Sequence, residues 1–444
     1  MQGAVFVPTN CVSEAQQWDS YDPVINDREL RYAAFYGINC VCVYLHYEVY
    51  LKKKEALLAH LEDFLSRADK YGLKTAVIFF DDCHDQPPPA VASADYRYPA
   101  PIYGVHNSQW LKCPGKKILQ HFAENEATLK AYVEDIVSAH KSDSRIAFWE
   151  TYNEPNRSKE TRQLLKAAIG WIHETGTTIP ATATGGDQFP GGPYSDFISW
   201  HKYHNYKFPK DVDFTALCTE CMNREGQSIP GLVEHFKGKT GFIFWEFGIG
   251  RDNCRFAWKN NLKHPAVAEP ATPFHGMIYP DGHPWALDDV KALMGPDNFA
   301  KAPVFTVNYY KDDHFGELAK TSITPMIDFD LDDEPGTGSP DASAGVPMEH
   351  FSVAWTGTIS APVSGTYTFY ADCDDRVKVL IDSQPILNKI SAGRSEVLAR
   401  LALTAHKPVP IKIEYVHATG RPSLHLAWSG PQISKSVLMP SKSL

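Results

Sequence analysis

Strand-like and helix-like segments alternate along the first 300 residues, and this alternation limits the fold more than any other feature of the sequence. Between the short apolar runs lie amphipathic stretches with apolar residues at the helical period, at 52–71, 116–140 and 158–175. The eight predicted strands are Ala4–Pro8, Asn39–His46, Lys74–Asp81, Arg145–Tyr152, Pro180–Thr184, Phe197–Tyr203, Phe214–Glu220 and Gly241–Phe247. Eight such units predict an α/β fold, a (β/α)₈ TIM barrel. The rival, an open doubly wound sheet, would need a glycine-rich phosphate turn after its first strand, and this chain has none there.

The pattern changes near residue 300. Short segments of alternating polarity, separated by turn residues, replace the helical periods. These segments are Val304–Tyr310, Phe351–Thr358, Gly365–Ala371, Val377–Asp382, Ile411–His417 and Ser423–Ser429. We therefore expect a barrel domain over residues 1–300 and a C-terminal all-β sandwich over residues 301–444.

Charge and composition restrict the partners. The chain has 53 acidic and 43 basic residues, a formal charge of −10, which disfavours a nucleic acid or an anionic membrane surface as partner. No apolar run reaches the roughly 18 residues that a membrane span needs. Aromatic residues make up 12%, which suits stacking on sugar rings and equally suits a large core. The sequence says nothing about oligomeric state.

The cysteines and the N-terminus are less informative. Nine cysteines without paired spacing argue against a disulfide framework, and Cys218-Thr-Glu-Cys221 lacks the second pair that a zinc site would need. We therefore expect no metal in the barrel. The first residues have no basic segment followed by an apolar one, as a signal peptide would. The expected location is periplasmic or extracellular if a leader has been removed, and cytoplasmic otherwise.

Carboxylates at the ends of barrel strands are the candidate catalytic groups, since the active site of this fold lies where strands end. Glu154 follows strand four, just before Pro155, while Glu220 ends strand seven and Glu246 lies on strand eight. A facing pair of carboxylates suits glycoside hydrolysis, one as acid and the other as nucleophile or base. The distance between them, which decides retention or inversion, is beyond the sequence.

The strand-four segment Trp149-Glu-Thr-Tyr-Asn-Glu-Pro155 resembles the signature of the clan A retaining glycosidases, the four-seven superfamily. This resemblance implies that Asn153 binds a substrate hydroxyl, that Glu154 is the acid/base and that the nucleophile ends strand seven. Counting strands selects Glu220 as nucleophile. Glu246 is the alternative if the count fails in the short stretch 204–213, which holds no full helix.

Within that clan, residues 1–300 resemble the bacterial cellulase-like glycoside hydrolases. The matching stretches are Phe80–Asp85, Gly104–Trp110, Ser199–Tyr203 and Cys218–Arg224. The resemblance implies cleavage of β-glycosidic bonds in oligo- or polysaccharides by double displacement. The long segment 82–113 is expected to wall the pocket and to favour exo action.

The remaining candidates for substrate binding share a position at a strand end or in that long segment. His201 and Tyr203 could also orient Glu220, and Trp245 could form the floor of the sugar site. The full set is Asn153, Trp149, His201, Tyr203, Trp245, Glu246, His46, Asp81, His106, Asn107 and Trp110. For His201 and Tyr203, a satisfied core residue remains the alternative.

The C-terminal region resembles the protective-antigen-type β-sandwich, on motifs that include Phe351–Gly357, Gly365–Phe369 and Asp374–Val377. The resemblance implies an accessory carbohydrate-binding domain. In some members an adjacent Asp pair, here Asp374-Asp375, binds calcium. The glycine that usually follows is Arg376 here, so a plain β-turn is the alternative, and no other cofactor is expected.

Two other functions remain open. The first is a carbohydrate-binding protein whose barrel has little or no turnover. The second is a metal-dependent hydrolase, which would need His-x-His at a strand end. His201-Lys-Tyr-His204 does not have that spacing.

Overall fold

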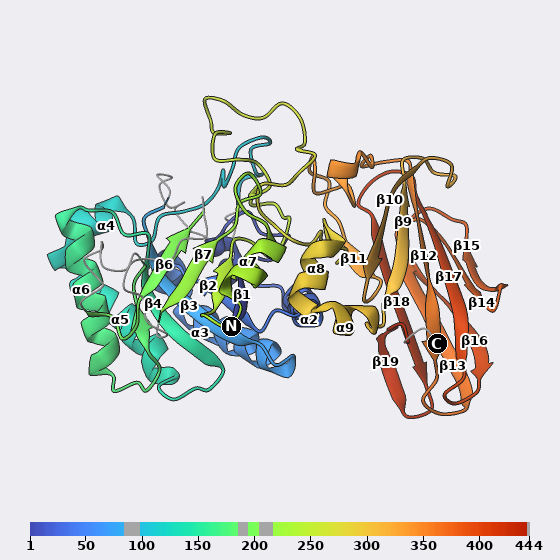
Figure 1. Ribbon diagram of the computed structural model, residues 1–444, viewed down its shortest axis with the longest axis horizontal. Coiled ribbons are helices and arrows are strands. Elements are labelled where there is room, and N and C mark those ends of the chain that lie inside the picture. The colour runs from blue at the N-terminus through green and yellow to red at the C-terminus, as the bar shows by residue number, and fades with distance from the viewer. Residues whose placement is uncertain (84–97, 185–193, 204–215, 442–444) are drawn as a thin grey trace. The chain divides into compact units, whose positions relative to one another are not determined.

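The computed structural model describes residues 1–83, 98–184, 194–203 and 216–441 (Figure 1). The chain divides into two compact units. The first comprises Met1–Ala266 with Phe274–Gly276, and the second comprises Val267–Pro273 with Met277–Leu444. Residues 277–300, which the sequence analysis assigns to the barrel, thus group with the second unit.

The first unit is an eight-stranded parallel barrel, which confirms the predicted fold class. Its strands are β1 (Gln2–Val5), β2 (Cys40–Tyr44), β3 (Lys74–Asp81), β4 (Ile146–Asn153), β5 (Ala181–Thr182), β6 (Ser199–Lys202), β7 (Leu217–Cys221) and β8 (Phe242–Phe244). They follow one another in the order β5-β4-β3-β2-β1-β8-β7-β6. A parallel bridge between Thr184 and Ser199 joins the two ends of this order. Glu154 therefore follows the fourth strand, and Glu220 lies on the seventh.

Helices follow the strands at most positions of this unit (Figure 1). They are α1 (Glu14–Asp19), α2 (Pro23–Phe35), α3 (Tyr47–Lys70), α4 (Lys116–Gln120), α5 (Phe122–Ala139), α6 (Lys159–Glu174) and α7 (Ile229–Phe236). The apolar stripe of α3 is buried, and Gly72 adopts a φ of +74° just beyond its end. The helix predicted over 116–140 is two helices that meet at His121. Across the described residues, no helix is both long and apolar enough to cross a membrane.

Helix α6 directly follows the segment that carries Glu154, and its N-terminus is capped. The Ser158 hydroxyl accepts a hydrogen bond from the Thr161 backbone N–H at 3.1 Å. We expect Ser158→Ala to lower the free energy of unfolding by about 1 kcal/mol, because an orphan N–H loses its acceptor. Urea unfolding of the variant tests this. A Ser158→Asp variant, which keeps an acceptor, should stay within about 0.5 kcal/mol of wild type, and equal losses in both variants would contradict the capping role.

The second unit is an all-β sandwich preceded by the short helices α8 (Leu287–Met294) and α9 (Pro296–Ala300). One sheet has the order β10-β9-β12-β17-β14-β15, and the other has the order β11-β18-β13-β16 with β19 paired to β18. The strands are β9 (Phe305–Tyr310), β10 (Leu318–Thr324), β11 (Asp328–Asp330), β12 (Phe351–Ser360), β13 (Gly365–Cys373), β14 (Arg376–Ile381), β15 (Gln384–Lys389), β16 (Ser395–Leu403), β17 (Pro408–His417), β18 (Ser423–Gly430) and β19 (Ile433–Val437).

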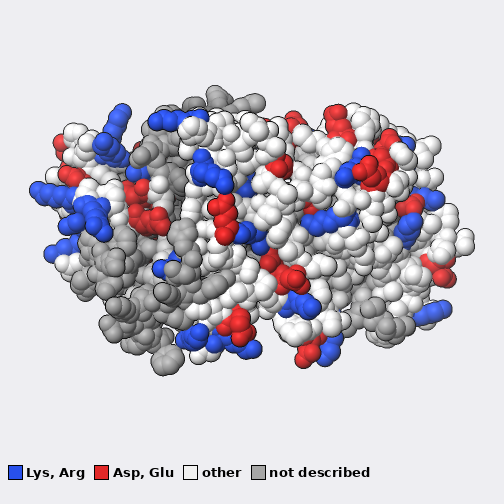
Figure 2. Space-filling view, turned by 45° about the horizontal axis from the view of Figure 1, so that its top comes forward, with Lys and Arg blue, Asp and Glu red and all other residues white. Residues whose placement is uncertain are grey.

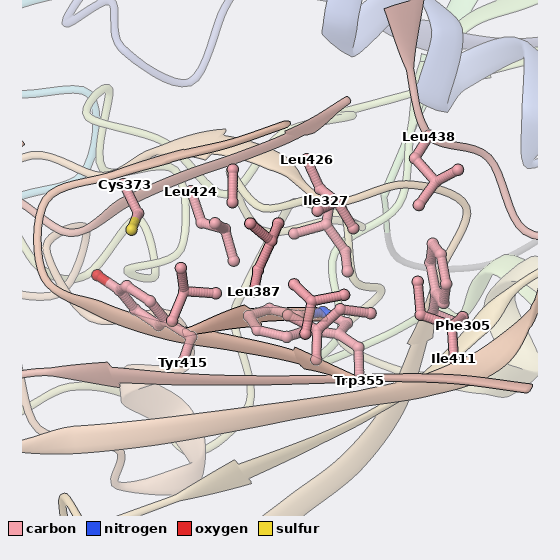
Figure 3. Packing of buried hydrophobic residues seen from close by; sticks show 14 of the residues in the cluster. Phe305, Ile327, Trp355, Cys373, Leu387, Ile411, Tyr415, Leu424, Leu426 and Leu438 are labelled. Carbon is pink, nitrogen blue, oxygen red and sulfur yellow. The ribbon is translucent and has the colours of Figure 1, made fainter. Parts of the chain in front are cut away.

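Apolar side chains from both sheets fill the sandwich (Figure 3). Trp355 on β12 and Tyr415 on β17 come from one sheet, while Leu424 and Leu426 on β18 come from the other. These positions alternate with more exposed ones along each strand, as a sandwich core requires. On the face drawn in Figure 2, acidic and basic side chains of the described residues are interspersed.

Candidate active site

Three ionisable side chains from neighbouring strands of the barrel meet at one point. A carboxylate oxygen of Glu154, a ring nitrogen of His201 and a carboxylate oxygen of Glu220 lie within 4.8 Å of one another. His201 Nδ1 lies 2.7 Å from Glu154 Oε1 and 3.7 Å from Glu220 Oε2. A carboxylate separation of roughly 5 Å is typical of retaining glycosidases, whereas inverting enzymes need a wider gap for water.

The two carboxylates differ in exposure. The Glu154 side chain is 42% exposed, whereas Glu220 is 8% exposed. Glu154 also has a φ of +43°, in the left-handed region that side chains other than glycine rarely adopt. The loop that holds this strained residue is tethered by Asp82, whose carboxylate accepts hydrogen bonds from Asn156 Nδ2 and from the Thr161 hydroxyl, at 2.5 and 2.7 Å.

Glu220 is held by hydroxyl donors. The Tyr203 hydroxyl donates to Glu220 Oε1, and the Tyr44 hydroxyl donates to Oε2 at 3.3 Å. Burial raises the pKa of Glu220 to about 7, with the His201 charge and the Tyr203 hydrogen bond acting in the opposite direction. Tyr203 thus lies where the sequence placed it, whereas Tyr44, the last residue of β2, was not among the candidates.

His201 is the cation of this group. Burial alone would lower its pKa, but the carboxylates of Glu220 and Glu154 raise the pKa to about 10. The imidazole is therefore protonated at neutral pH and lies between two carboxylates. Its positive charge balances that of the buried Glu220 carboxylate, which has little contact with solvent.

A second chain of hydrogen bonds runs beside Glu154. Asn153 Nδ2 donates to Asp81 Oδ1 at 2.9 Å, and the Trp110 indole donates to Asp81 Oδ2 at 2.8 Å. The Cys83 thiol donates to Glu154 Oε2 at 3.0 Å. Burial raises the pKa of Asp81 to about 6. Asp81 therefore orients both the amide and the indole, and Cys83 is a contact of Glu154 that sequence analysis missed.

Aromatic rings pack beside these groups inside the barrel. The ring centroids of Trp110 and Trp245 are 5.1 Å apart, and Tyr44 contacts them edge-on at 5.3 and 5.8 Å. Trp258, with 42% exposure, contacts the Tyr203 ring at 4.9 Å. Trp258 was not predicted, because it lies beyond the last strand in a segment with no helical or strand pattern.

A further carboxyl group lies deeper in the barrel. Glu150 is buried and accepts a hydrogen bond from the Thr184 hydroxyl. Burial raises its pKa to about 8, with the His201 charge acting to lower it. We expect this group to be mainly neutral near pH 7. Sequence analysis did not select Glu150, since it lies within the strand rather than at its end.

Trp149 corrects an expectation. Successive side chains of a strand point to opposite faces, so Trp149 lies on the other face from Glu150. There it is fully buried, with its ring centroid 5.7 Å from that of Phe79. It packs outside the barrel interior and does not line the pocket.

The other candidates occupy separate positions. His46 is buried 3.8 Å from Glu14, and His106 Nδ1 lies 2.7 Å from the Phe256 carbonyl oxygen. Asn107 contacts the Cys254 thiol at 2.7 Å. Glu246 groups with Asp252 and Cys254, and not with Glu154 and Glu220. Residues 84–97 of the predicted pocket wall and the whole stretch 204–213, which includes His204, lie outside the described residues.

The Asp374-Asp375 pair of the sandwich already has protein partners. Asp374 accepts hydrogen bonds from the Tyr415 hydroxyl at 2.6 Å and from His417 at 2.9 Å, and Asp375 accepts one from the Ala418 N–H at 2.7 Å. The buried Lys389 ammonium donates to four backbone carbonyl oxygens, those of Asp374, Asp375, Ser391 and Gly393. Calcium binds through six to eight oxygen ligands. Here protein donors already bond to three of the four carboxylate oxygens of the pair, and calcium at this pair stays a prediction.

Comparisons with known proteins match parts of the chain. A PA14 domain matches residues 301–442. The anti-sigma-I factor RsgI3 of Acetivibrio thermocellus is 35% identical over 135 residues, which is 30% of this chain and 20% of that protein. The chain thus spans about a fifth of the length of the curated relative that it matches.

Solved structures also match parts of the chain. An anti-sigma factor domain-containing protein from Clostridium clariflavum is 28% identical, covering 32% of this chain and 47% of that chain, with a TM-score of 0.29. The PA14 sugar-binding domain from an RTX adhesin is 18% identical, covering 32% and 99%, with a TM-score of 0.27. A β-mannanase from the blue mussel Mytilus edulis is 14% identical, covering 55% and 87%, with a TM-score of 0.40.

Proposed function

We propose that this protein is a retaining glycoside hydrolase that cleaves β-glycosidic bonds in oligo- or polysaccharides. The single observation that carries the proposal is the approach of Glu154 and Glu220, from the fourth and seventh strands, within 4.8 Å of each other and of His201. Two carboxyl groups whose facing oxygens lie this close suit double displacement, in which one of them attacks the sugar directly.

In the first step, the Glu220 carboxylate attacks the anomeric carbon, and the bond to the leaving oxygen breaks. Glu154 gives its proton to that oxygen, so the leaving group departs as an alcohol. In the second step, Glu154 takes a proton from water, whose oxygen displaces Glu220 from the sugar. Tyr203 and Tyr44 hold the Glu220 carboxylate, and His201 balances its charge.

Substrate binding is proposed for the groups around this pair. Asn153 Oδ1 is buried and has no hydrogen-bond partner among the described residues, so it can accept a hydrogen bond from a sugar hydroxyl. The exposed Trp258 ring, which contacts Tyr203, can stack on a sugar at the rim. Exo action stays a proposal that depends on the long segment 82–113.

For the sandwich we propose an accessory carbohydrate-binding role, supported by its resemblance to the protective-antigen-type domains. The alternative function is a carbohydrate-binding protein without turnover. The PA14 match does not distinguish the two, because it lies wholly outside the barrel.

A panel of aryl β-glycosides and β-linked oligosaccharides, followed by NMR of the first product anomer, tests the proposed hydrolase. We expect turnover of at least one substrate, with the β-anomer formed first and no loss of activity in EDTA. An α-anomer would contradict retention. Binding by calorimetry without any turnover would favour the alternative. Loss of activity in EDTA, in a protein whose circular dichroism spectrum is unchanged, would favour the metal-dependent hydrolase.

The pH dependence of kcat/KM should identify His201 as the charge partner of Glu220. Burial raises the pKa of Glu220 to about 7, so protonation of this nucleophile should lower kcat/KM as the pH falls through that region. In His201→Gln the cation that lowers this pKa is lost, so the acidic limb should move to higher pH. Profiles of kcat/KM against pH measure the limb. His173→Gln, at an exposed imidazole on α6, should leave it in place, and an unmoved limb in His201→Gln would contradict the assignment.

A further inference from the structure

A second group of convergent side chains lies in the barrel unit, away from the Glu154–Glu220 pair. Glu246 follows β8, and Asp252 and Cys254 lie in the segment beyond it. A carboxylate oxygen of Glu246, a carboxylate oxygen of Asp252 and the sulfur of Cys254 lie within 4.8 Å of one another. Glu246, Asp252 and Cys254 are 1%, 2% and 1% exposed, so water does not reach their polar atoms.

Three of the four carboxylate oxygens in this group lack partners in the described part of the chain, while Asp252 Oδ1 accepts a hydrogen bond from the Cys254 backbone N–H at 3.2 Å. Glu246 Oε1, Glu246 Oε2 and Asp252 Oδ2 are buried and have no hydrogen-bond partner among the described residues. The buried carboxylate of Glu29, by contrast, accepts a hydrogen bond from the Thr9 N–H at 3.1 Å. A buried carboxylate without a partner costs several kcal/mol. One proton shared by Glu246 and Asp252 would satisfy two of the three oxygens and leave the third, whereas a cation would satisfy all three.

The Cys254 sulfur lies within hydrogen-bond distance of two polar side chains. The Trp245 indole N–H donates to Cys254 Sγ at 3.0 Å. The Cys254 thiol in turn donates to Asn107 Oδ1 at 2.7 Å. Amide oxygen and nitrogen are assigned from the hydrogen-bond network. With the amide turned over, Asn107 would also donate to the sulfur, and two N–H donors would stabilise a thiolate.

We propose that Glu246, Asp252 and Cys254 bind one divalent transition-metal ion of the zinc class. Two carboxylates and a thiolate form a donor set of mixed hardness, which suits Zn²⁺ and disfavours Mg²⁺ and Ca²⁺. Three protein ligands leave the fourth tetrahedral position to water or to Asn107. The ion would tie the segment 246–254 together behind Trp245, so its role is structural and independent of the proposed hydrolysis.

Metal content and a spectroscopic probe test this site. The full chain, produced with zinc in the medium and passed through a weak chelator, should retain about one zinc per chain. After removal of zinc, added Co²⁺ should give the near-ultraviolet charge-transfer band of a cobalt–thiolate bond. Zn²⁺ should also raise the Tm of the metal-free protein, and Mg²⁺ at the same concentration should not.

Variants assign the ligands. Cys254→Ser should abolish the cobalt–thiolate band, and Glu246→Gln should reduce zinc retention at least about tenfold. Cys11→Ser is the matched control, because Cys11 is an equally buried thiol outside the group. It should keep both signals. If a variant fails to fold, the wild-type measurements decide. No retained zinc, no cobalt–thiolate band and no effect of zinc on the Tm would then contradict the site. If both variants fold, unchanged metal binding in both would also contradict it.

Discussion

Glu220→Ala is expected to lower kcat by at least about 10⁴-fold on every β-glycoside that the wild-type protein hydrolyses. The reason is geometric as well as chemical. Of the carboxylates considered as nucleophile, Glu220 belongs to the Glu154–His201 group, and Glu246 belongs to a separate one. Without the Glu220 carboxylate, the glycosyl-enzyme ester cannot form.

The kinetics of two further variants sharpen this expectation. Glu154→Ala should lose activity mainly on substrates with poor leaving groups, because an activated phenolate departs without a proton. Glu225→Ala is the control, since Glu225 is exposed and pairs with Lys259. Initial rates on an activated and an unactivated glycoside, with folding checked by circular dichroism, measure all three. Full activity in Glu220→Ala, with loss in Glu246→Ala, would assign the nucleophile to strand eight.

Lys389→Met is expected to lower the free energy of unfolding of the sandwich by about 3–5 kcal/mol. The Lys389 ammonium is 4% exposed and donates to four backbone carbonyl oxygens at the turn that carries Asp374 and Asp375. Methionine keeps most of the side-chain volume but leaves these carbonyls without a donor. The internal cation thus lies at the turn that carries the Asp pair for which the sequence resemblance suggested calcium.

Thermal and urea unfolding of the full chain measure the effect of Lys389→Met. Lys412→Met is the control, because Lys412 is 48% exposed and pairs with Glu414 at the surface. It should change the stability by no more than about 1 kcal/mol. Added Ca²⁺ should not change the Tm of the wild-type protein. A calcium-dependent rise in Tm, or a Lys389→Met variant as stable as wild type, would contradict the role of this lysine.

The barrel could be predicted because its strands are buried apolar runs separated by amphipathic helices. Strand β3 spans the predicted Lys74–Asp81, and β4 differs from its prediction by one residue at each end. Once the strands were counted, the rule that strand ends form the site made Glu154, Glu220, Glu246 and His201 candidates. The four-seven spacing implied by the clan A resemblance then selected Glu220 over Glu246.

The sandwich was predicted less completely. Its central strands alternate clearly, but β16 (Ser395–Leu403) is largely exposed or half-buried along its length, so its sequence carries only a weak alternating signal. Strands β10, β11, β15 and β19 were missed as well. Edge strands such as β10 and β15 have a neighbour on one side only, so packing restricts their residues less.

Side-chain contacts formed by tertiary structure were beyond the sequence. The Cys83 thiol reaches Glu154 across 71 positions, and Lys389 reaches the carbonyl oxygen of Asp375 across 14. No periodicity encodes such a contact, because it depends on how two loops approach. Trp149 shows the opposite error, since an aromatic residue close to the catalytic segment was assigned to the pocket although the pleat turns it outward.

Covalent trapping of the nucleophile tests the central claim most directly. The full chain would be incubated with a 2-deoxy-2-fluoro glycoside of a sugar that it hydrolyses, then digested and mapped by mass spectrometry. We predict one fluoroglycosyl group per chain on the peptide containing Glu220, with fragmentation assigning it to that residue and no labelling of Glu220→Ala. A label on Glu246, or no label on a protein that turns the parent glycoside over, would contradict the account.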